Sequence, residues 1–150
     1  MDLVIRPLAE ADLPGVLALE EFSHPTSWTE GMFRFEMTQE ISCFLVVHER
    51  TSGRLVGYGG FWNMVGDGNI TNVTVAPEFR RRGIGRRIVE ELLERMRQQT
   101  MEYASLEVRD SNASAIHLYE SCGFSLLGRR PGYYGDGETA RIYGRRLADG

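Results

Sequence analysis

The sequence has few of the residues that mark a disulfide-rich or metal-binding protein. Its 150 residues include two cysteines, Cys43 and Cys122, and three histidines, His24, His48 and His117. The cysteines are far apart and outside any C-x-x-C pattern, and the histidines form no H-E-x-x-H motif, so neither a disulfide framework nor a metal site is expected. We interpret the cysteines as small buried apolar residues and the histidines as surface or partly packed side chains.

The sequence also lacks a basic excess and a long apolar run. Its formal net charge is −4, whereas nucleic-acid-binding domains are usually basic. The N-terminal stretch carries acidic residues early, which predicts neither a signal peptide nor a membrane span. From this and the length we expect one domain over residues 1–150, cytoplasmic and monomeric, with no nucleic-acid or membrane partner.

Hydrophobic patterning predicts a mixed α/β fold, with a central sheet of about six or seven strands flanked by four helices. The predicted order is β-α-α-β-β-β-α-β-α-β-β. Asp12 is expected to cap the first helix, and Ser27–Glu30 matches a capping box before the second. The strand predicted over Ile70–Val75 alternates strictly, which would place Thr71, Val73 and Val75 on one face.

An arginine- and glycine-rich stretch, RRRGIG, covers Arg80, Arg81, Arg82, Gly83, Ile84 and Gly85. It lies between a predicted strand and a helix in which Ile84, Ile88, Leu92 and Met96 recur every four residues. The first N–H groups of a helix bind anions, and arginines beside them add charge. The stretch is therefore either an anion site or a solvated arginine run before an ordinary helix. It matches neither a Walker A loop nor a G-x-G-x-x-G fingerprint, because Ile88 stands where the third glycine would be.

The surrounding sequence resembles the GCN5-related N-acetyltransferases (GNAT). RRRGIG fits the R/Q-x-x-G-x-G/A pattern of that family, and Asn72–Pro77 looks like the strand that precedes it there. Residues 106–124, LEVRDSNASAIHLYESCGF, closely resemble the RimI-type protein N-terminal acetyltransferases. The resemblance follows the element order over nearly the whole chain, with the motifs concentrated in residues 70–134.

This resemblance implies a GNAT fold that is split between the fourth and fifth strands, with acetyl-CoA as cosubstrate and no metal. The cofactor would lie in the split between Ile70–Val75 and Tyr103–Arg109. Its pyrophosphate would sit on the loop, and its pantetheine arm would pair with one strand. The implied contacts are Val73, Thr74, Val75, Arg80, Arg81, Arg82, Gly83, Ile84, Gly85, Arg86 and Asn112.

The RimI-like context also implies two catalytic residues. Glu107 would be the general base, because on a strand it points away from the apolar side chains of Leu106 and Val108; otherwise it is an ordinary solvated glutamate. Tyr119 would be the general acid that protonates the coenzyme A thiolate. Its helical spacing with Leu118 and Cys122 equally suits a core aromatic, and a ring can be packed while its hydroxyl reaches a site.

The acceptor side is expected at Tyr133 and Tyr134, in a glycine-rich loop, with Trp28 on the opposite wall. The alternatives are exposed loop aromatics and, for Trp28, a hydrophobic staple on the second helix. Two stretches depart from the RimI pattern: residues 26–29 read Thr-Ser-Trp-Thr where relatives often have Pro-Trp-Ser, and residues 138–140 read Glu-Thr-Ala where many have Glu-Asp-Ala.

Three functions follow as hypotheses. The first is acetylation of a protein N-terminus, with the N-terminal alanine of small-subunit ribosomal protein eighteen as the family's named bacterial target. The second is acetylation of a small-molecule amine on the same fold. The third is a non-catalytic acetyl-CoA-binding regulatory subunit, which would need neither Glu107 nor Tyr119.

Overall fold

The computed structural model describes residues 1–25 and 27–147. Within them, seven strands and four α-helices follow one another in the predicted order. The strands are β1 (Leu3–Pro7), β2 (Ser42–Glu49), β3 (Leu55–Met64), β4 (Asp67–Val75), β5 (Tyr103–Arg109), β6 (Ser125–Arg130) and β7 (Ala140–Arg146). The helices are α1 (Leu13–Ser23), α2 (Glu30–Thr38), α3 (Ile84–Gln98) and α4 (Ala113–Ser121).

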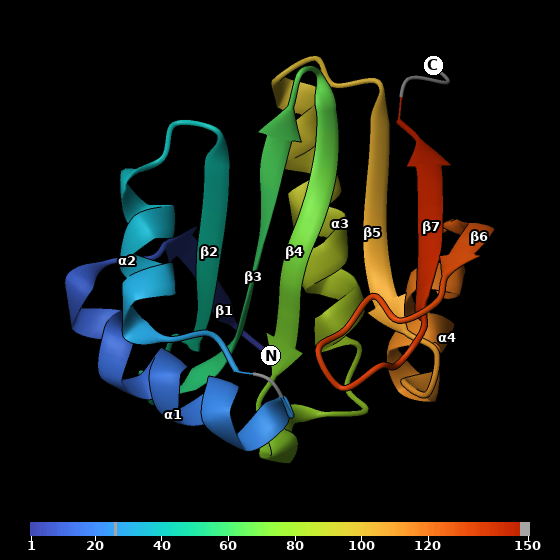
Figure 1. The fold of residues 1–150 in the computed structure, drawn as a ribbon. Helices are drawn as coiled ribbons and strands as arrows, with labels where there is room; N and C mark the ends of the chain where they lie inside the picture. Colours follow the sequence, from blue (N-terminus) through green and yellow to red (C-terminus); the bar gives the residue numbers. More distant parts are fainter. Residues whose placement is uncertain (26, 148–150) are drawn as a thin grey trace.

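The strands form one sheet in the order β1-β2-β3-β4-β5-β7-β6. All neighbours are antiparallel except β4 and β5, which are parallel. Helices α1 and α2 cover one face of the sheet and α3 and α4 the other (Figure 1). This architecture confirms the predicted mixed sheet with four helices, and the single parallel pair lies where the split was expected.

A β-bulge at Thr71 accompanies the split. Strands β4 and β5 pair from Asp67 opposite Tyr103 to Ile70 opposite Leu106, where their pairing ends. At the same point the β3–β4 register skips Thr71, so that β4 gains one residue over β3. An extra residue bends the strand and changes its direction. Beyond the bulge, β4 and β5 diverge toward their carboxyl ends (Figure 1).

The bulge also corrects the prediction that β4 alternates strictly. Val73 and Val75 pack in the core beneath α3, together with Ile70, which strict alternation would have placed on the opposite face. Asn72 and Thr74, although buried, face α1, where Asn72 hydrogen-bonds Glu20. The unpredicted extra residue therefore brings two polar side chains to the α1 side of β4.

Helix α3 lies directly on the backbone of β3. Its buried face consists of Ile84, Ile88, Val89, Leu92, Leu93 and Met96, as the four-residue periodicity predicts. A Cβ on Gly59 would lie 2.8 Å from Ile88 Cγ2, closer than packed carbon atoms approach. This glycine therefore permits the close contact that sets the position of α3 over the sheet.

Two capping predictions were wrong. Asp12 is the N-cap residue of α1, but its side chain makes no capping bond; the carboxylate binds Arg6 and the Ala9 N–H instead. Helix α2 is capped by Thr29, whose hydroxyl accepts from the Met32 N–H, rather than by Ser27. In both places several polar residues lie near the helix start, and tertiary contacts select among them.

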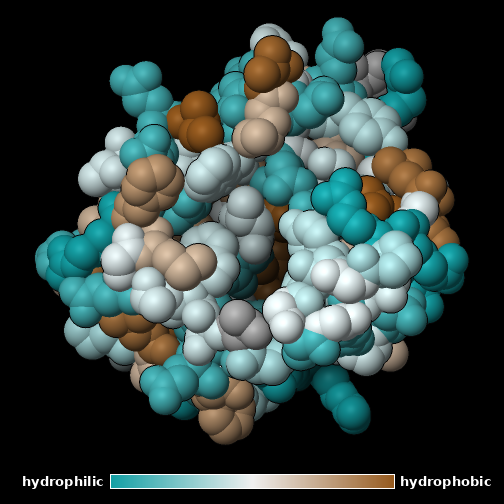
Figure 2. All heavy atoms as spheres, viewed as in Figure 1, coloured by the Kyte–Doolittle hydropathy of each residue, from teal (hydrophilic) through white to brown (hydrophobic). Residues whose placement is uncertain are grey.

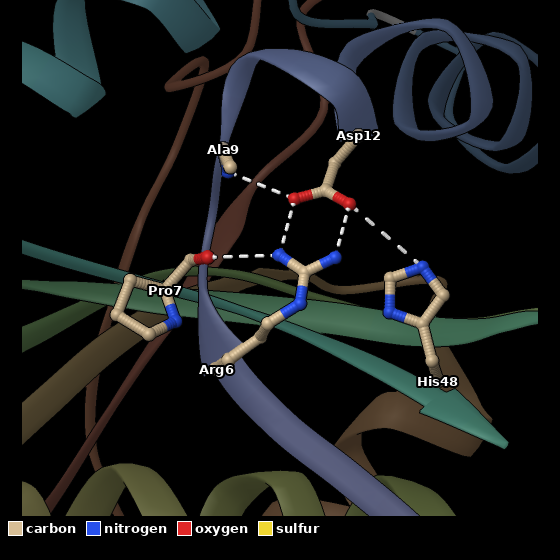
Figure 3. Close-up of polar contacts among 5 residues, drawn as sticks. All are labelled: Arg6, Pro7, Ala9, Asp12 and His48. Atoms are coloured by element: carbon tan, nitrogen blue, oxygen red, sulfur yellow. Dashed lines mark hydrogen bonds and ion pairs between the residues drawn. The ribbon is translucent and has the colours of Figure 1, made fainter. Parts of the chain in front are cut away.

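Asp12 anchors β1 to the start of α1 (Figure 3). Its carboxylate receives two bonds of 2.7 Å from the Arg6 guanidinium, and His48 Nε2 lies 3.8 Å from Asp12 Oδ1. The Arg6 guanidinium, and less strongly the Ala9 N–H, hold the pKa of this carboxyl below its ordinary value, while burial lowers the pKa of His48. The Asp12 side chain is 4% exposed, so this ion pair is largely shielded from water.

We expect Asp12→Ala to lower the free energy of unfolding by about 2 kcal/mol, because it removes a bidentate pair and a backbone cap. The lowered pKa means that this contribution is present above about pH 4 and is lost as the pH falls through the folded-state value. Urea unfolding from pH 3 to pH 7 measures both effects.

The matched control is Asp2→Ala, which removes an exposed pair with Arg50 at 2.9 Å. Such pairs contribute at most about 1 kcal/mol. Equal losses of stability in the two variants would contradict the role assigned to Asp12.

Candidate functional site

The diverging ends of β4 and β5 leave an opening in the sheet. Seen from the α1 and α2 side, the surface is hollowed near its centre, and hydrophobic atoms lie at the bottom of the hollow (Figure 2). The Ala76 N–H donates to the Val56 carbonyl of β3. In an antiparallel pair, backbone groups of successive residues point alternately toward the partner strand and away from it. The N–H and C=O groups of Val75 and Val73 therefore point away from β3, toward the split. The split thus presents strand backbone that β5 does not pair with.

The arginine- and glycine-rich loop connects this part of β4 to α3. Arg81 and Gly83 both have left-handed backbone conformations, with φ of 63° and 76°. Successive turns of this kind direct backbone N–H groups to one side, next to the positive end of α3. The loop therefore has the geometry of an anion site, which favours that interpretation over a plain solvated run.

The arginines of the loop have distinct partners. The Arg80 Nε donates to the Val75 carbonyl at 3.0 Å, at the edge of the split. The Arg82 guanidinium lies 5.5 Å from the centre of the Phe79 ring, and Arg86 pairs with Glu90 along the helix at 2.8 Å. Of these three guanidiniums, that of Arg80 lies at the end of β4, that of Arg82 lies beside Phe79, and that of Arg86 lies along the start of α3.

Glu107 lies on β5 at the point where pairing with β4 has ended. Residues Tyr103–Arg109 alternate between half-buried and buried positions, and Glu107 is half-buried. Its side chain therefore points away from the core that holds Leu106 and Val108, as predicted. Its Oε2 accepts a hydrogen bond of 3.1 Å from Asn69 Nδ2.

Tyr119 is packed in the core, with 7% of its surface exposed. Its ring meets that of Phe124 edge-on at 5.9 Å. Burial, with smaller contributions from Cys122 and Tyr134, raises the pKa of the Tyr119 hydroxyl, so it stays protonated at neutral pH. The residue is thus a core aromatic, and its role as an acid stays a prediction.

Tyr134 connects the predicted site residues. Burial above all, and then the nearby Tyr133, raises the pKa of Tyr134 to about 12, with Glu107 also contributing. The Arg109 guanidinium lies 4.2 Å from the centre of its ring. Arg109 follows Glu107 by two residues on the same face of β5, so this contact places Tyr134 at the end of the strand that bears Glu107.

The β6–β7 loop is held against the end of β5. Arg109 Nη1 donates to Asp136 at 2.8 Å and to Glu138 at 2.9 Å. Glu138 also accepts from the Ser111 N–H at 2.8 Å. The Arg109 guanidinium lies against the Tyr134 ring, whereas the Tyr133 ring contacts Arg130. The loop that bears the two tyrosines is therefore fixed to the end of β5.

Asn112 caps α4, as the sequence predicts. Its Oδ1 accepts from the Ala115 N–H at 3.2 Å. This bond fixes the side chain at the start of α4, where the backbone leaves β5. Its predicted contact with the cofactor stays a prediction.

Trp28 packs as a hydrophobic staple on α2, which is the alternative to a role in acceptor binding. Its ring lies 5.1 Å from that of Phe33 and 5.8 Å from that of Phe44. Since Thr29 caps α2, Trp28 and Phe33 occupy the two positions of a hydrophobic staple. Of the stretch expected around it, Thr26 lies outside the described residues.

A buried carboxylate, Glu20, ties this stretch to β4, and sequence reasoning missed it. Glu20 is 1% exposed and accepts from Tyr58 Oη at 2.9 Å, Asn72 Nδ2 at 3.0 Å and the Trp28 N–H at 3.0 Å. Beside it, His24 Nε2 lies 2.8 Å from Thr74 Oγ1. The available signal was a glutamate that shares a helical face with apolar side chains, as Glu20 does with Val16.

Other features lie outside the split. A groove of about 770 Å³ runs between α3, the end of α4 and β7, and includes Arg86, Cys122 and Arg145. Cys122 and Cys43 are free, and burial raises the pKa of both thiols. Within residues 1–25 and 27–147, no group of three or more potential ligands is placed to hold a metal, and no helix is long and apolar enough to cross a membrane.

Comparisons with known proteins give a consistent result. Residues 10–124 match the sequence profile of the acetyltransferase (GNAT) family. The ribosomal protein bS18-alanine N-acetyltransferase of Escherichia coli strain K12 is 30% identical over 130 residues, which cover 87% of this chain and 86% of that protein. The family match includes the loop, Glu107 and Tyr119, and ends before Tyr133 and Tyr134.

Solved structures agree. The crystal structure of the ribosomal-protein-S18-alanine N-acetyltransferase from Escherichia coli has a TM-score of 0.87 at 29% identity, covering 99% of this chain and 96% of that one. Ard1 from Thermoplasma volcanium has a TM-score of 0.90 at 26% identity, covering 99% and 100%. Both similarities extend over the whole sheet, including the split.

We expect Glu20→Ala to lower the free energy of unfolding by about 3 kcal/mol, because it leaves buried donors on Tyr58 and Asn72 without an acceptor. Glu21→Ala, at the exposed neighbouring position, should change it by less than about 0.5 kcal/mol. Urea unfolding of both variants checks this. A loss below 1 kcal/mol for Glu20→Ala would show that the hydrogen bonds around it are unimportant.

Proposed function

Because the chain belongs to the acetyltransferase (GNAT) family and is an N-acetyltransferase of the RimI type, we propose that its acceptor is the α-amino group of a protein N-terminus. The observation that carries the proposal is the position of Glu107, which lies on the face of β5 away from the core and beside the unpaired end of β4, two residues before Arg109 and its contact with the Tyr134 ring. The named bacterial relatives support the N-terminal alanine of ribosomal protein bS18 as the target. The proposal treats residues 1–150 as one acetyltransferase domain, monomeric and cytoplasmic.

The donor proposed for the split is acetyl-CoA, which supplies an acetyl group activated as a thioester. The residues present suit it. The unpaired backbone of Val73–Val75 offers hydrogen bonds to the amides of a pantetheine arm, and the loop Arg80–Arg86 offers N–H groups and guanidiniums to a pyrophosphate. Asn112, at the start of α4, is assigned to the same ligand.

Proton transfer falls to two side chains. An α-ammonium group has an ordinary pKa near about 8, so a carboxylate is sufficient to take its proton, directly or through water, at neutral pH. Glu107 is proposed for this step, because its carboxylate faces the hollow rather than the core. A backbone N–H of β4 is proposed to stabilise the negative charge that develops on the acetyl oxygen.

Tyr119 is proposed as the acid that protonates the departing thiolate. Burial raises its pKa, so the hydroxyl carries its proton when the thiolate departs and can donate a hydrogen bond to it. Tyr133 and Tyr134 are proposed to border the acceptor peptide, with Trp28 on the far wall. Trp28 is anchored in the core, so it would contribute a fixed edge.

We expect Glu107→Gln to lower kcat for transfer to an alanine-terminated peptide by a factor of about 10² to 10⁴. The affinity for acetyl-CoA should stay within about two-fold, because the amide has the same shape and lies outside the loop. Steady-state kinetics and calorimetry measure the two quantities.

Glu102→Gln, at an exposed position just before β5, is the matched control and should have wild-type kinetics. Transfer by Glu107→Gln at the wild-type rate would show that Glu107 is not the base. A wild-type protein that binds acetyl-CoA without transferring the acetyl group to any acceptor would instead favour the non-catalytic alternative.

The acceptor class is tested by comparing peptides with small amines. We expect acetylation of peptides that begin with alanine and none of the same peptides with a blocked N-terminus. Polyamines and aminoglycosides should not be acetylated, because the two aromatic rings carry no charge and the carboxylates of the same loop, Asp136 and Glu138, are already bound by Arg109. Mass spectrometry of protein N-termini from cells with and without the protein identifies the natural acceptor. Turnover of amines with none on any peptide would favour the small-molecule alternative.

A further inference from the structure

Asn69 lies on β4 just before the bulge and contacts Glu107 across the edge of the split. Its Nδ2 donates to Glu107 Oε2 at 3.1 Å, to Ser105 Oγ at 3.3 Å and to the Ser105 carbonyl at 3.4 Å. The Ser105 carbonyl and the Glu107 carboxylate are both acceptors, so the amide nitrogen, and not its oxygen, faces them.

Strand register brings these groups together. Asn69 is paired with Ser105, and one pair later the parallel pairing ends at Ile70 and Leu106. Ser105 and Glu107 lie two residues apart and share one face of β5. Glu107 is therefore the first residue on that face of β5 that has no paired residue on β4. The Asn69 side chain, just before the bulge, still reaches its carboxylate.

We propose that Asn69 is a positioning residue that orients the Glu107 carboxylate for proton transfer. The inference rests on the proposed role of Glu107 as the base. The amide holds Oε2 against β4, which directs Oε1 toward the hollow. A carboxylate on an otherwise free side chain samples several rotamers, and holding one of them raises the fraction of time spent in the productive geometry.

The inference assigns a second role to the end of the parallel pairing. Pairing between β4 and β5 ends at Ile70 and Leu106, next to the bulge at Thr71 and to the proposed base. Asn69 thus contacts Ser105, its paired residue on β5, and also Glu107, the first residue on that face of β5 without a pairing partner. Sequence reasoning did not single it out, because an asparagine in a strand has no motif around it.

A purely structural role is the competing explanation. Asn69 also bridges β4 and β5 through Ser105, and loss of this bridge alone would loosen the strands. Ser105→Ala removes the contact with the serine hydroxyl but leaves Asn69 beside Glu107. It is therefore the matched control for a bridging role.

The test uses the full chain with acetyl-CoA and an alanine-terminated peptide. Asn69→Ala should lower kcat by about ten-fold to a hundred-fold and leave KM for acetyl-CoA unchanged. Ser105→Ala should keep a kcat within about two-fold of wild type. In the Glu107→Gln background, Asn69→Ala should have no further effect on kcat, because its target is gone.

A second readout needs no turnover. In nitrogen-15 NMR of the free protein, Glu107→Gln should shift the side-chain amide resonances of Asn69, because it removes the charged acceptor of the 3.1 Å hydrogen bond. Glu102→Gln, at an exposed position outside this contact, should leave them unchanged. Unchanged Asn69 resonances in Glu107→Gln would show that the contact with the carboxylate is absent in solution.

The outcomes separate the inference from the proposed function. If Glu107→Gln is inactive but Asn69→Ala has wild-type kcat and thermal stability, the positioning role is wrong and the base assignment stands. If Ser105→Ala loses as much activity as Asn69→Ala, Asn69 acts as a strand bridge and the inference fails. If Glu107→Gln is fully active, the base assignment fails, and the positioning role of Asn69 fails with it.

Discussion

The arrangement of the site depends on one interruption of a hydrogen-bonded ladder. The extra residue at Thr71 bends β4 where its pairing with β5 ends. Backbone groups that would have bonded a neighbouring strand are thereby left for a ligand. The interruption also turns Asn72 and Thr74 toward α1, where Asn72 donates to the buried Glu20 carboxylate and Thr74 donates to the Asn72 side-chain oxygen. One inserted residue thus accompanies both the opening of the sheet and the attachment of β4 to α1.

Much of the fold could be predicted because it follows from local pattern. The four-residue stripe from Ile84 to Met96 gave α3 its length and buried face, and glycine-rich turns separated the strands correctly. The prediction of a regular strand over Ile70–Val75 missed the bulge, although two consecutive polar residues, Thr71 and Asn72, interrupt the alternation there. The helix caps failed for a related reason: Asp12 and Ser27 satisfy the local rule, but Arg6 and Thr29 offered better contacts in the folded chain.

Some residues of the candidate site could likewise be predicted from the sequence and others could not. The loop and the region around Glu107 and Tyr119 were found through a family resemblance, since a strand glutamate and a helix tyrosine carry no signal of their own. Glu20 and Asn69 were missed because their importance depends on what lies opposite them in space. Polar side chains whose partners are distant in sequence are visible only once the register of the strands is known.

The close contact between α3 and β3 has a consequence for the distant end of that helix. Ile88 leaves no room for a side chain on Gly59, and a Cβ on Gly57 would lie 3.1 Å from Ile88 Cδ1. The two glycines therefore set the distance between α3 and β3. A methyl group at either position would displace Ile88, which lies in the second turn of α3. Because the arginine- and glycine-rich loop leads directly into the first turn of α3, a substitution in the middle of β3 would also shift the loop for which anion binding is proposed.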